Sequence, residues 1–211
     1  LLTLVKEQRD CKTEGKEAIK RFGNVRGVLD ASPDDLRQVS GIGDMSVFVI
    51  KLTRALVELY YGERMRDGEP QLGNSQAVVD YLKVAMGALD RETFRVVYLD
   101  AQHRPKAVET LFEGTLTSSV VYPREVFRKA LEHNSDAVIL AHNHPSGCID
   151  PSQHDRQITR EMITASALLG VRVLDHIIVG ANSHFSFADH GLIREYGMQA
   201  SSFHERLRRE S

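Results

Sequence analysis

The sequence predicts an α/β protein in two parts, a small all-α module followed by a larger α/β sandwich. Up to about residue 66 the apolar residues recur mostly at helical spacing, with no convincing strand among them. Residues 66–74 concentrate glycine, proline and charge, which is typical of a linker. After them, strand patterns alternate with amphipathic helices, as in helices packed on a sheet. We therefore expect a helical module at 1–66, a linker at 67–74, an α/β domain at 75–199 and a charged tail at 200–211.

The first module is expected to contain three helices. Residues 12–22 predict a short helix that ends at Gly23. Ser32 has the residue type of an N-cap, with Pro33 as the first helical residue of the next helix. A longer helix with apolar periodicity runs from Asp44 to about Tyr61.

The second part is expected to begin with a helix at 75–88 that is capped by Ser75. The elements predicted after it are strands at 93–99 and 106–116 around a turn at 102–105, a helix at 123–134, a strand at 137–141, a helix from 150–151 to 169, strands at 172–179 and 184–187, and a last helix from about 190. The strand at 137–141 is apolar throughout, so it should be covered on both faces.

Composition narrows the class of protein and its compartment. The chain has 211 residues, is 42% hydrophobic and carries a formal net charge of −2, so no whole-molecule field attracts nucleic acid or an anionic membrane. Cys11 and Cys148 form no disulfide framework, which favours a reducing compartment. No apolar run approaches the roughly 20 residues that span a bilayer. We expect a cytoplasmic protein with no membrane partner, although a chain that begins at Leu1 leaves a removed leader open.

Two histidines follow directly on the buried strand. His142 and His144 are two residues apart, and in extended chain such residues point to the same side, so both imidazoles can reach one ion. Asp155 lies near the start of the next helix, after a loop that can fold the helix start back over the strand end. Two imidazoles and a carboxylate leave one tetrahedral position for water, which is the layout of a catalytic zinc site. Zinc lowers the pKa of such a water towards about 7.

Ser152 lies three residues before Asp155, where its hydroxyl can donate to a developing oxyanion. Helix capping is the competing interpretation, because Asp150 and Ser152 are both good caps and Pro151 suits a first helical position. We expect Asp150 to cap the helix and Ser152 to face the site. His154 ranks second to Asp155 as the third ligand because it lies on a different side of the helix.

The motif formed by these residues resembles a known one. His142-x-His144, seven residues, Ser152, two residues and Asp155 match the JAMM motif of the JAB1/MPN/Mov34 metalloenzymes at every defined position. With the strings AHNHPSG, LDHIIVG and GTLTSSVVYPREVF, the chain resembles the RadC family, MPN-domain proteins long labelled as DNA repair proteins, over roughly residues 1–196. The resemblance implies a JAMM/MPN (cytidine-deaminase-like) α/β sandwich, one zinc ion per chain, and hydrolysis of a peptide or isopeptide bond.

That family also needs a glutamate ahead of the first long strand, and the resemblance assigns this position to Glu92. Its role would be to take a proton from the zinc water and deliver it to the leaving amine. The residues alone do not select Glu92 over three other acids, Glu109, Glu113 and Glu125.

Four further residues near the motif have open roles. Asn143 stands where ubiquitin-directed members of the family usually have serine or threonine, which puts a ubiquitin-like substrate in doubt. Asp175 and His176 either support a zinc-bound imidazole or form a pair at a strand end, and we favour the structural interpretation. Cys148 lies in the motif loop but outside the ligand pattern.

Val39-Ser40-Gly41-Ile42-Gly43 resembles the hairpin of helix-hairpin-helix modules. The backbone N–H groups of Gly41, Ile42 and Gly43 could meet a DNA phosphate without reading sequence. An ordinary helix–helix corner is the alternative, and Asp44 places a carboxylate directly after the turn.

Two functions are therefore compared. The first is a zinc-dependent hydrolase acting on a peptide or protein substrate, with the N-terminal module recruiting DNA or a partner. The second is a DNA-repair accessory protein whose zinc site is structural or vestigial. The intact motif favours the first, and the sequence specifies neither the substrate nor the oligomeric state.

Overall fold

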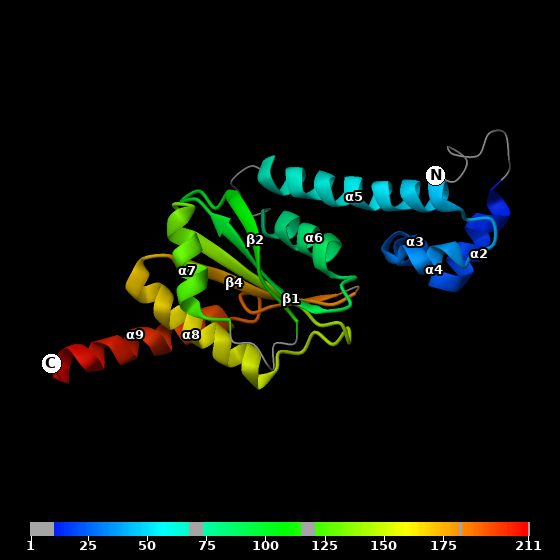
Figure 1. Ribbon diagram of the computed structural model, residues 1–211. Helices are drawn as coiled ribbons and strands as arrows, with labels where there is room; N and C mark the ends of the chain where they lie inside the picture. Colours follow the sequence, from blue (N-terminus) through cyan, green and yellow to red (C-terminus); the bar gives the residue numbers. More distant parts are fainter. Residues whose placement is uncertain (1–10, 68–73, 115–120, 182, 211) are drawn as a thin grey trace. The chain divides into compact units, whose positions relative to one another are not determined.

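The computed structural model describes residues 11–67, 74–114, 121–181 and 183–210 (Figure 1). The chain forms two compact units, Leu1–Tyr61 and Gly62–Ser211. Within the described residues, no helix combines the length and the apolar character that a membrane span requires.

The described residues of the first unit form four helical segments around a small apolar core. They are α2 (Lys12–Phe22), α3 (Val25–Asp30), α4 (Pro33–Arg37) and the beginning of α5 (Asp44–Asp67). As predicted, α2 ends at Gly23, and Ser32 caps α4 by accepting a hydrogen bond from the Asp35 amide. The sequence analysis missed α3, whose capping residue Asn24 accepts a hydrogen bond from the Gly27 amide.

Helix α5 is longer than predicted, because it continues from Tyr61 through Gly62 to Asp67. The extension is stabilised by Met65, which is 2% exposed in the core of the second unit. The predicted linker is correspondingly shorter, since helix α6 (Asn74–Met86) begins before Ser75, which is therefore not its cap. Residues 68–73 lie outside the described residues.

The second unit is a five-stranded mixed sheet with helices on both faces, which confirms the predicted α/β sandwich. Its described strands follow the order β2-β1-β3-β4-β5, and among them β3 and β4 form the one parallel pair. The elements are β1 (Glu92–Leu99), β2 (Pro105–Gly114), α7 (Pro123–Glu132), β3 (Ala137–Asn143), α8 (Gln153–Leu169), β4 (Arg172–Val179), β5 (His184–Ser186) and α9 (Leu192–Glu210).

The sheet separates two apolar cores. Helix α6 covers one face, where its side chains pack with Ala137, Ile139 and Ala141 of β3. Helices α7, α8 and α9 cover the other face, where they pack with Val138 and Leu140. All seven residues of β3 are buried, as its continuous apolar run predicts.

One predicted boundary of the second unit falls outside the described residues, and another differs. The strand expected at 106–116 corresponds to β2 as far as Gly114, and residues 115–120, which include its last two expected residues and part of the GTLTSSVVYPREVF string, lie outside the described residues. The expected charged tail at 200–211 is helical as far as Glu210, because α9 runs on without a break. Tyr196 and Ala200, one helical turn apart, are both buried in the core.

Candidate metal centre

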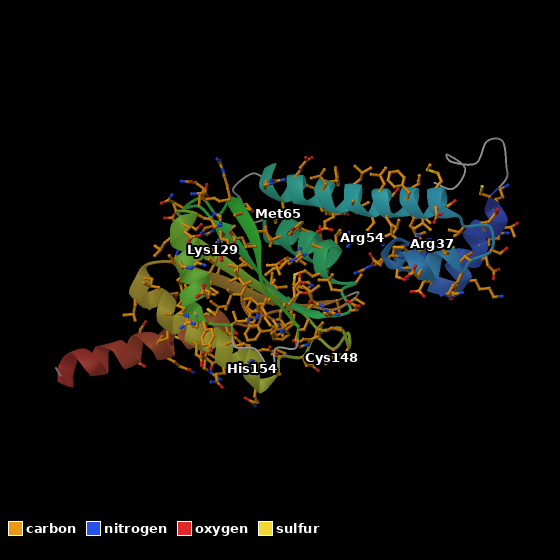
Figure 2. The ribbon with its side chains drawn as sticks, viewed as in Figure 1. Arg37, Arg54, Met65, Lys129, Cys148 and His154 are labelled. Atoms are coloured by element: carbon orange, nitrogen blue, oxygen red, sulfur yellow. The ribbon has the colours of Figure 1, made fainter. Side chains whose placement is uncertain are left out.

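The candidate centre lies where the end of β3 meets the beginnings of β1 and α8. Strands β1 and β3 are antiparallel with Phe94 opposite His142, so the first residues of β1 lie beside the last residues of β3. The loop from β3 to α8 carries Cys148, and His154 lies in the first turn of α8 (Figure 2). The topology therefore brings three elements that are distant in sequence to one edge of the sheet.

The two histidines converge through their Nε2 atoms, which are 3.0 Å apart. His142 is fully buried in β3, and the amide of His144 continues the parallel ladder by donating to the Val179 carbonyl at 3.1 Å. This extended backbone directs both imidazoles to the same face of the sheet. The ring of Phe94 stacks on that of His142, with centroids 6.2 Å apart and an interplanar angle of 8°.

The carboxylate of Asp155 faces both histidines. Its Oδ1 lies 3.1 Å from Nε2 of His142, and its Oδ2 lies 3.7 Å from Nε2 of His144. Burial favours the neutral acid, but the adjacent His142 ring and the hydrogen bonds from Ser152 outweigh this effect and lower the pKa of Asp155. The side chain is therefore a buried anion held against two imidazoles.

Ser152 caps α8, and its hydroxyl is directed at Asp155. The Ser152 Oγ accepts a hydrogen bond from the Asp155 amide at 3.1 Å and donates one to Oδ2 of Asp155 at 2.6 Å. The Ser152 amide donates to the same oxygen at 2.7 Å, which completes a capping box. The expectation that Asp150 caps the helix and Pro151 begins it is wrong, because this reciprocal pair starts the helix at Gln153.

Glu92 also reaches this edge, as the first residue of β1 rather than the residue before it. Its Oε1 lies 3.9 Å from Nε2 of His144. Glu92, His142 and His144 each offer a ligand atom, and these three atoms lie within 4.8 Å of one another. Besides the two imidazoles, a carboxylate is thus available as the third ligand from either Asp155 or Glu92.

The three competing glutamates have other surroundings. Glu109 bonds to His133 at 2.6 Å and forms an ion pair with Lys129, whereas Glu125 pairs with Arg128 at 3.1 Å. Glu113 lies on β2, opposite Thr93. The group of close ligand atoms includes neither Asp155 nor His154. Asp155 nevertheless contacts both histidines, whereas Nε2 of His154 is buried with no hydrogen-bond partner among the described residues.

Asn143, between the two histidines, forms hydrogen bonds with the backbone on both sides of Glu92. Its Oδ1 accepts a hydrogen bond from the Thr93 amide at 2.8 Å, and its Nδ2 donates to the Arg91 carbonyl at 3.0 Å and the Leu89 carbonyl at 3.3 Å. The side chain is 2% exposed. Sequence reasoning noticed this residue only as a departure from related enzymes and did not anticipate its contacts.

A third histidine, His176, contacts Nδ1 of His142, the ring nitrogen that does not face Asp155. Nε2 of His176 lies 2.8 Å from Nδ1 of His142, and His176 is fully buried. Burial, together with the nearby His142, lowers the pKa of His176 well below its ordinary value. The contact contradicts our view of His176 as part of a strand-end pair only, and it supports the alternative of a residue that supports the imidazole.

The donor atoms fit a zinc ion. Nδ1 of His144 lies 2.5 Å from the carbonyl oxygen of Cys148, which can only accept, so this nitrogen carries the ring proton and Nε2 of the neutral ring has its lone pair. That lone pair, Nε2 of His142 and the Asp155 carboxylate point to the same place, and such groups repel unless a positive charge lies among them. Imidazole nitrogens and carboxylate oxygens are the ligands of catalytic zinc sites.

Part of the hairpin that was predicted to contact DNA is buried in the core of the first unit. Gly41 has φ +82, which favours glycine, while Ile42 is 4% exposed in the apolar core. A Cβ atom on Gly41 would lie 3.0 Å from Oε1 of Glu14, so a carboxylate packs on the turn. With Asp44 after the turn, these charges oppose a phosphate, and DNA contact through Gly41, Ile42 and Gly43 stays a prediction.

The fold and this residue set define an α/β domain of the JAB type with a candidate metal centre. A family model described as "RadC-like JAB domain" matches residues 72–192. The chain belongs to this family.

Curated relatives extend the similarity over most of the chain. A UPF0758 protein of Leptothrix cholodnii is 45% identical over 181 residues, which cover 84% of this chain and 79% of that protein. UPF0758 proteins of Burkholderia thailandensis and Burkholderia mallei are 43% and 42% identical over 83% of this chain, and the match covers 66% and 63% of their lengths. This chain thus spans about two thirds of the Burkholderia proteins, and the names assign no activity.

Proposed function

We propose that this protein is a zinc-dependent hydrolase of the JAMM metallopeptidase type that cleaves a peptide or isopeptide bond. The observation that carries the proposal is the convergence of His142 and His144 on the buried carboxylate of Asp155, with Glu92 3.9 Å from His144. Hydrolytic zinc sites combine three protein ligands with a water and a neighbouring proton-transfer group.

Three residues would hold one zinc ion, through Nε2 of His142, Nε2 of His144 and Oδ1 of Asp155. Oδ2 of Asp155 would keep its hydrogen bonds from Ser152, which direct Oδ1 towards the histidines. When bound, zinc supplies Lewis acidity, which lowers the pKa of a water towards about 7 and polarises a carbonyl.

Glu92 would move the proton. Its carboxylate would accept a proton from the attacking water and donate it to the leaving amine, a role that typically contributes a factor of roughly 10² to 10⁴. The side chain of Glu92 is 17% exposed, whereas that of Asp155 is 3% exposed, so Glu92 is the acid that can meet a substrate.

Ser152 would contribute in two ways. In the resting site its hydroxyl proton is directed at Oδ2 of Asp155 and aligns that carboxylate. Donation to a developing oxyanion requires the hydroxyl to rotate away from Asp155, and we propose that it does so during the reaction.

A second function is favoured by one observation, the presence of Glu92 among the close ligand atoms. If Glu92 were a fourth ligand, the four protein ligands would close the site, and the protein would be a DNA-repair accessory protein with structural zinc. The greater exposure of Glu92 favours hydrolysis. The substrate would be a peptide or protein, and Asn143 in place of serine or threonine argues against a ubiquitin-like one.

The test is metal analysis of the purified chain, followed by a screen of peptide and isopeptide substrates with and without a chelator. About one zinc per chain and chelator-sensitive cleavage would support the hydrolase. A native protein that contains no metal and takes up none on adding zinc would overturn it. Bound zinc without cleavage of any tested bond would favour the accessory protein.

A further inference from the structure

A continuous chain of hydrogen bonds runs from the backbone of Asp155 to the ring of His142. The hydroxyl of Thr159 lies 2.5 Å from the Asp155 carbonyl oxygen and 2.7 Å from Nδ1 of His176. Nε2 of His176 lies 2.8 Å from Nδ1 of His142. Thr159, His176 and His142 all have 0% exposure.

For neutral imidazole rings, the first of these contacts sets the direction of the other hydrogen bonds. A carbonyl oxygen can only accept, so Thr159 gives its single hydroxyl proton to Asp155. The Thr159 oxygen must then accept from Nδ1 of His176, which therefore carries a proton. The neutral His176 ring leaves Nε2 as an acceptor, so Nδ1 of His142 donates to it.

The same argument places the lone pair of the His142 ring on Nε2. A neutral imidazole carries one proton, and with that proton on Nδ1 the lone pair is on Nε2, which faces His144 and Asp155. The other tautomer would place an N–H at this position, where it would donate to Oδ1 of Asp155 and could not bind a metal ion. The hydrogen bonds through His176 must outweigh this contact for the metal-binding tautomer to prevail. Aromatic rings also hold His176 in place, since Phe187 stacks on it with centroids 5.0 Å apart and an interplanar angle of 16°.

We propose that Thr159 and His176 are positioning residues that select the metal-binding tautomer of His142. The link to metal binding rests on the proposed zinc site, whereas the tautomer itself is a property of the metal-free chain. We call the hydrogen bonds from the Asp155 carbonyl through Thr159 and His176 to His142 the relay. Through it, the backbone of one proposed ligand sets the position of the ring proton in another.

The first experiment measures ring protonation. Long-range ¹⁵N–¹H correlation spectra of the ¹⁵N-labelled, metal-free chain at alkaline pH distinguish Nδ1–H from Nε2–H in each histidine. We expect His142 and His176 both to carry the proton on Nδ1. A wild-type His142 that carries it mainly on Nε2 overturns the proposal.

The second experiment removes the relay hydroxyl. Thr159→Val keeps the shape but leaves Nδ1 of His176 without its acceptor, so the tautomers of His142 should mix and zinc affinity should fall about 10- to 100-fold. Thr159→Ser restores the hydroxyl and should restore both measurements. Thr164→Val is the matched control, because the Thr164 hydroxyl donates to a carbonyl four residues earlier in the same helix, that of Arg160, as Thr159 does to Asp155.

The outcomes separate this proposal from the hydrolase. An unchanged His142 tautomer in Thr159→Val, or equal loss of zinc affinity in Thr164→Val, overturns the relay. A loss of stability without a tautomer change identifies Thr159 as merely structural and also overturns it. A wild-type chain with the expected tautomer that binds no zinc overturns the hydrolase but supports the relay.

Discussion

The side chain of Asn143 accepts a hydrogen bond from the backbone amide of Thr93, 2.8 Å away and fifty residues earlier in the chain. The same side chain donates to the Arg91 carbonyl, so it holds the backbone on both sides of Glu92. The residue between two candidate zinc ligands thus positions the candidate proton carrier.

Asn143→Ala should therefore reduce turnover while zinc is retained. The substitution leaves buried backbone groups without partners, which costs about 1–3 kcal/mol of stability, and releases the segment that carries Glu92. The histidines should keep their geometry, because His144 still donates to the Val179 carbonyl. Zinc content and hydrolysis are measured on the same preparation. Full activity in a folded variant would show that Asn143 does not position Glu92.

Glu92→Gln and Asp155→Asn should differ in whether the protein retains zinc. If Glu92 carries the proton, Glu92→Gln keeps zinc and loses turnover by a factor of roughly 10² to 10⁴. Asp155→Asn should weaken zinc retention, because it removes the anionic ligand. Zinc occupancy after dialysis against a weak chelator, compared with turnover, distinguishes the two. Replacing both His142 and His144 by alanine is the metal-free reference, and loss of zinc in Glu92→Gln would make Glu92 a ligand.

Ser152→Ala should reduce both stability and turnover while the protein retains zinc. Loss of the N-cap costs about 1 kcal/mol, and loss of an oxyanion donor typically costs a factor of 10² to 10³ in rate. Ser32→Ala is a matched control, since Ser32 caps α4 with the same pattern, accepting from the Asp35 amide at 3.1 Å and donating to Oδ2 of Asp35 at 2.7 Å. Thermal unfolding and hydrolysis should both change for Ser152→Ala, whereas Ser32→Ala should change unfolding only. Equal turnover in the two variants would refute a role of Ser152 in the reaction.

Asp175 should make the folded protein less stable as the pH rises. Burial raises the pKa of Asp175 to about 6, although Ser186 and two backbone amides donate hydrogen bonds to its carboxylate. Asp175 is therefore protonated in the folded state at pH values where the unfolded chain has already lost the proton. Its contribution to stability is fully present below about pH 4 and is lost as the pH rises through 6, by at most about 3 kcal/mol.

The measurement for Asp175 is urea unfolding of the chelator-treated chain between pH 4 and 8, compared with Asp175→Asn. The difference in unfolding free energy between wild type and variant should decline across this range and level off above pH 7. A difference that is independent of pH would mean that Asp175 ionises normally in the folded protein.

The features that could be predicted from the sequence are determined by residues that lie close together in the chain. The apolar run of β3, the two-residue spacing of His142 and His144 and the start of α4 at Ser32 are all local patterns, and each appears in the structure. The extension of α5 was missed because its last turns are stabilised by burial of Met65 among residues of later elements. Local periodicity carries no information about such packing.

The parts of the site that sequence reasoning missed depend on strand register. Glu92 reaches His144 only because β1 pairs with β3 in an antiparallel register that places Phe94 opposite His142. His176 reaches His142 because β4 lies parallel to β3 on its other side. The residues alone therefore did not single out Glu92, and only the resemblance to the RadC family did. Asp150 was mistaken for the cap because local sequence allows two capping residues two positions apart, and the contact with Asp155 selects Ser152.

The hydrogen-bonded path from Asp155 through Thr159 and His176 to His142 consists of side chains and backbone of this chain alone. The proposed ligands are therefore brought together when the chain folds. Their side chains lose conformational freedom at that step and not on metal binding. In small zinc domains, by contrast, metal binding and folding are one event, and chelators unfold them. If the proposed zinc is bound, its removal should leave the sheet intact, and metal exchange should occur on a chain that stays folded.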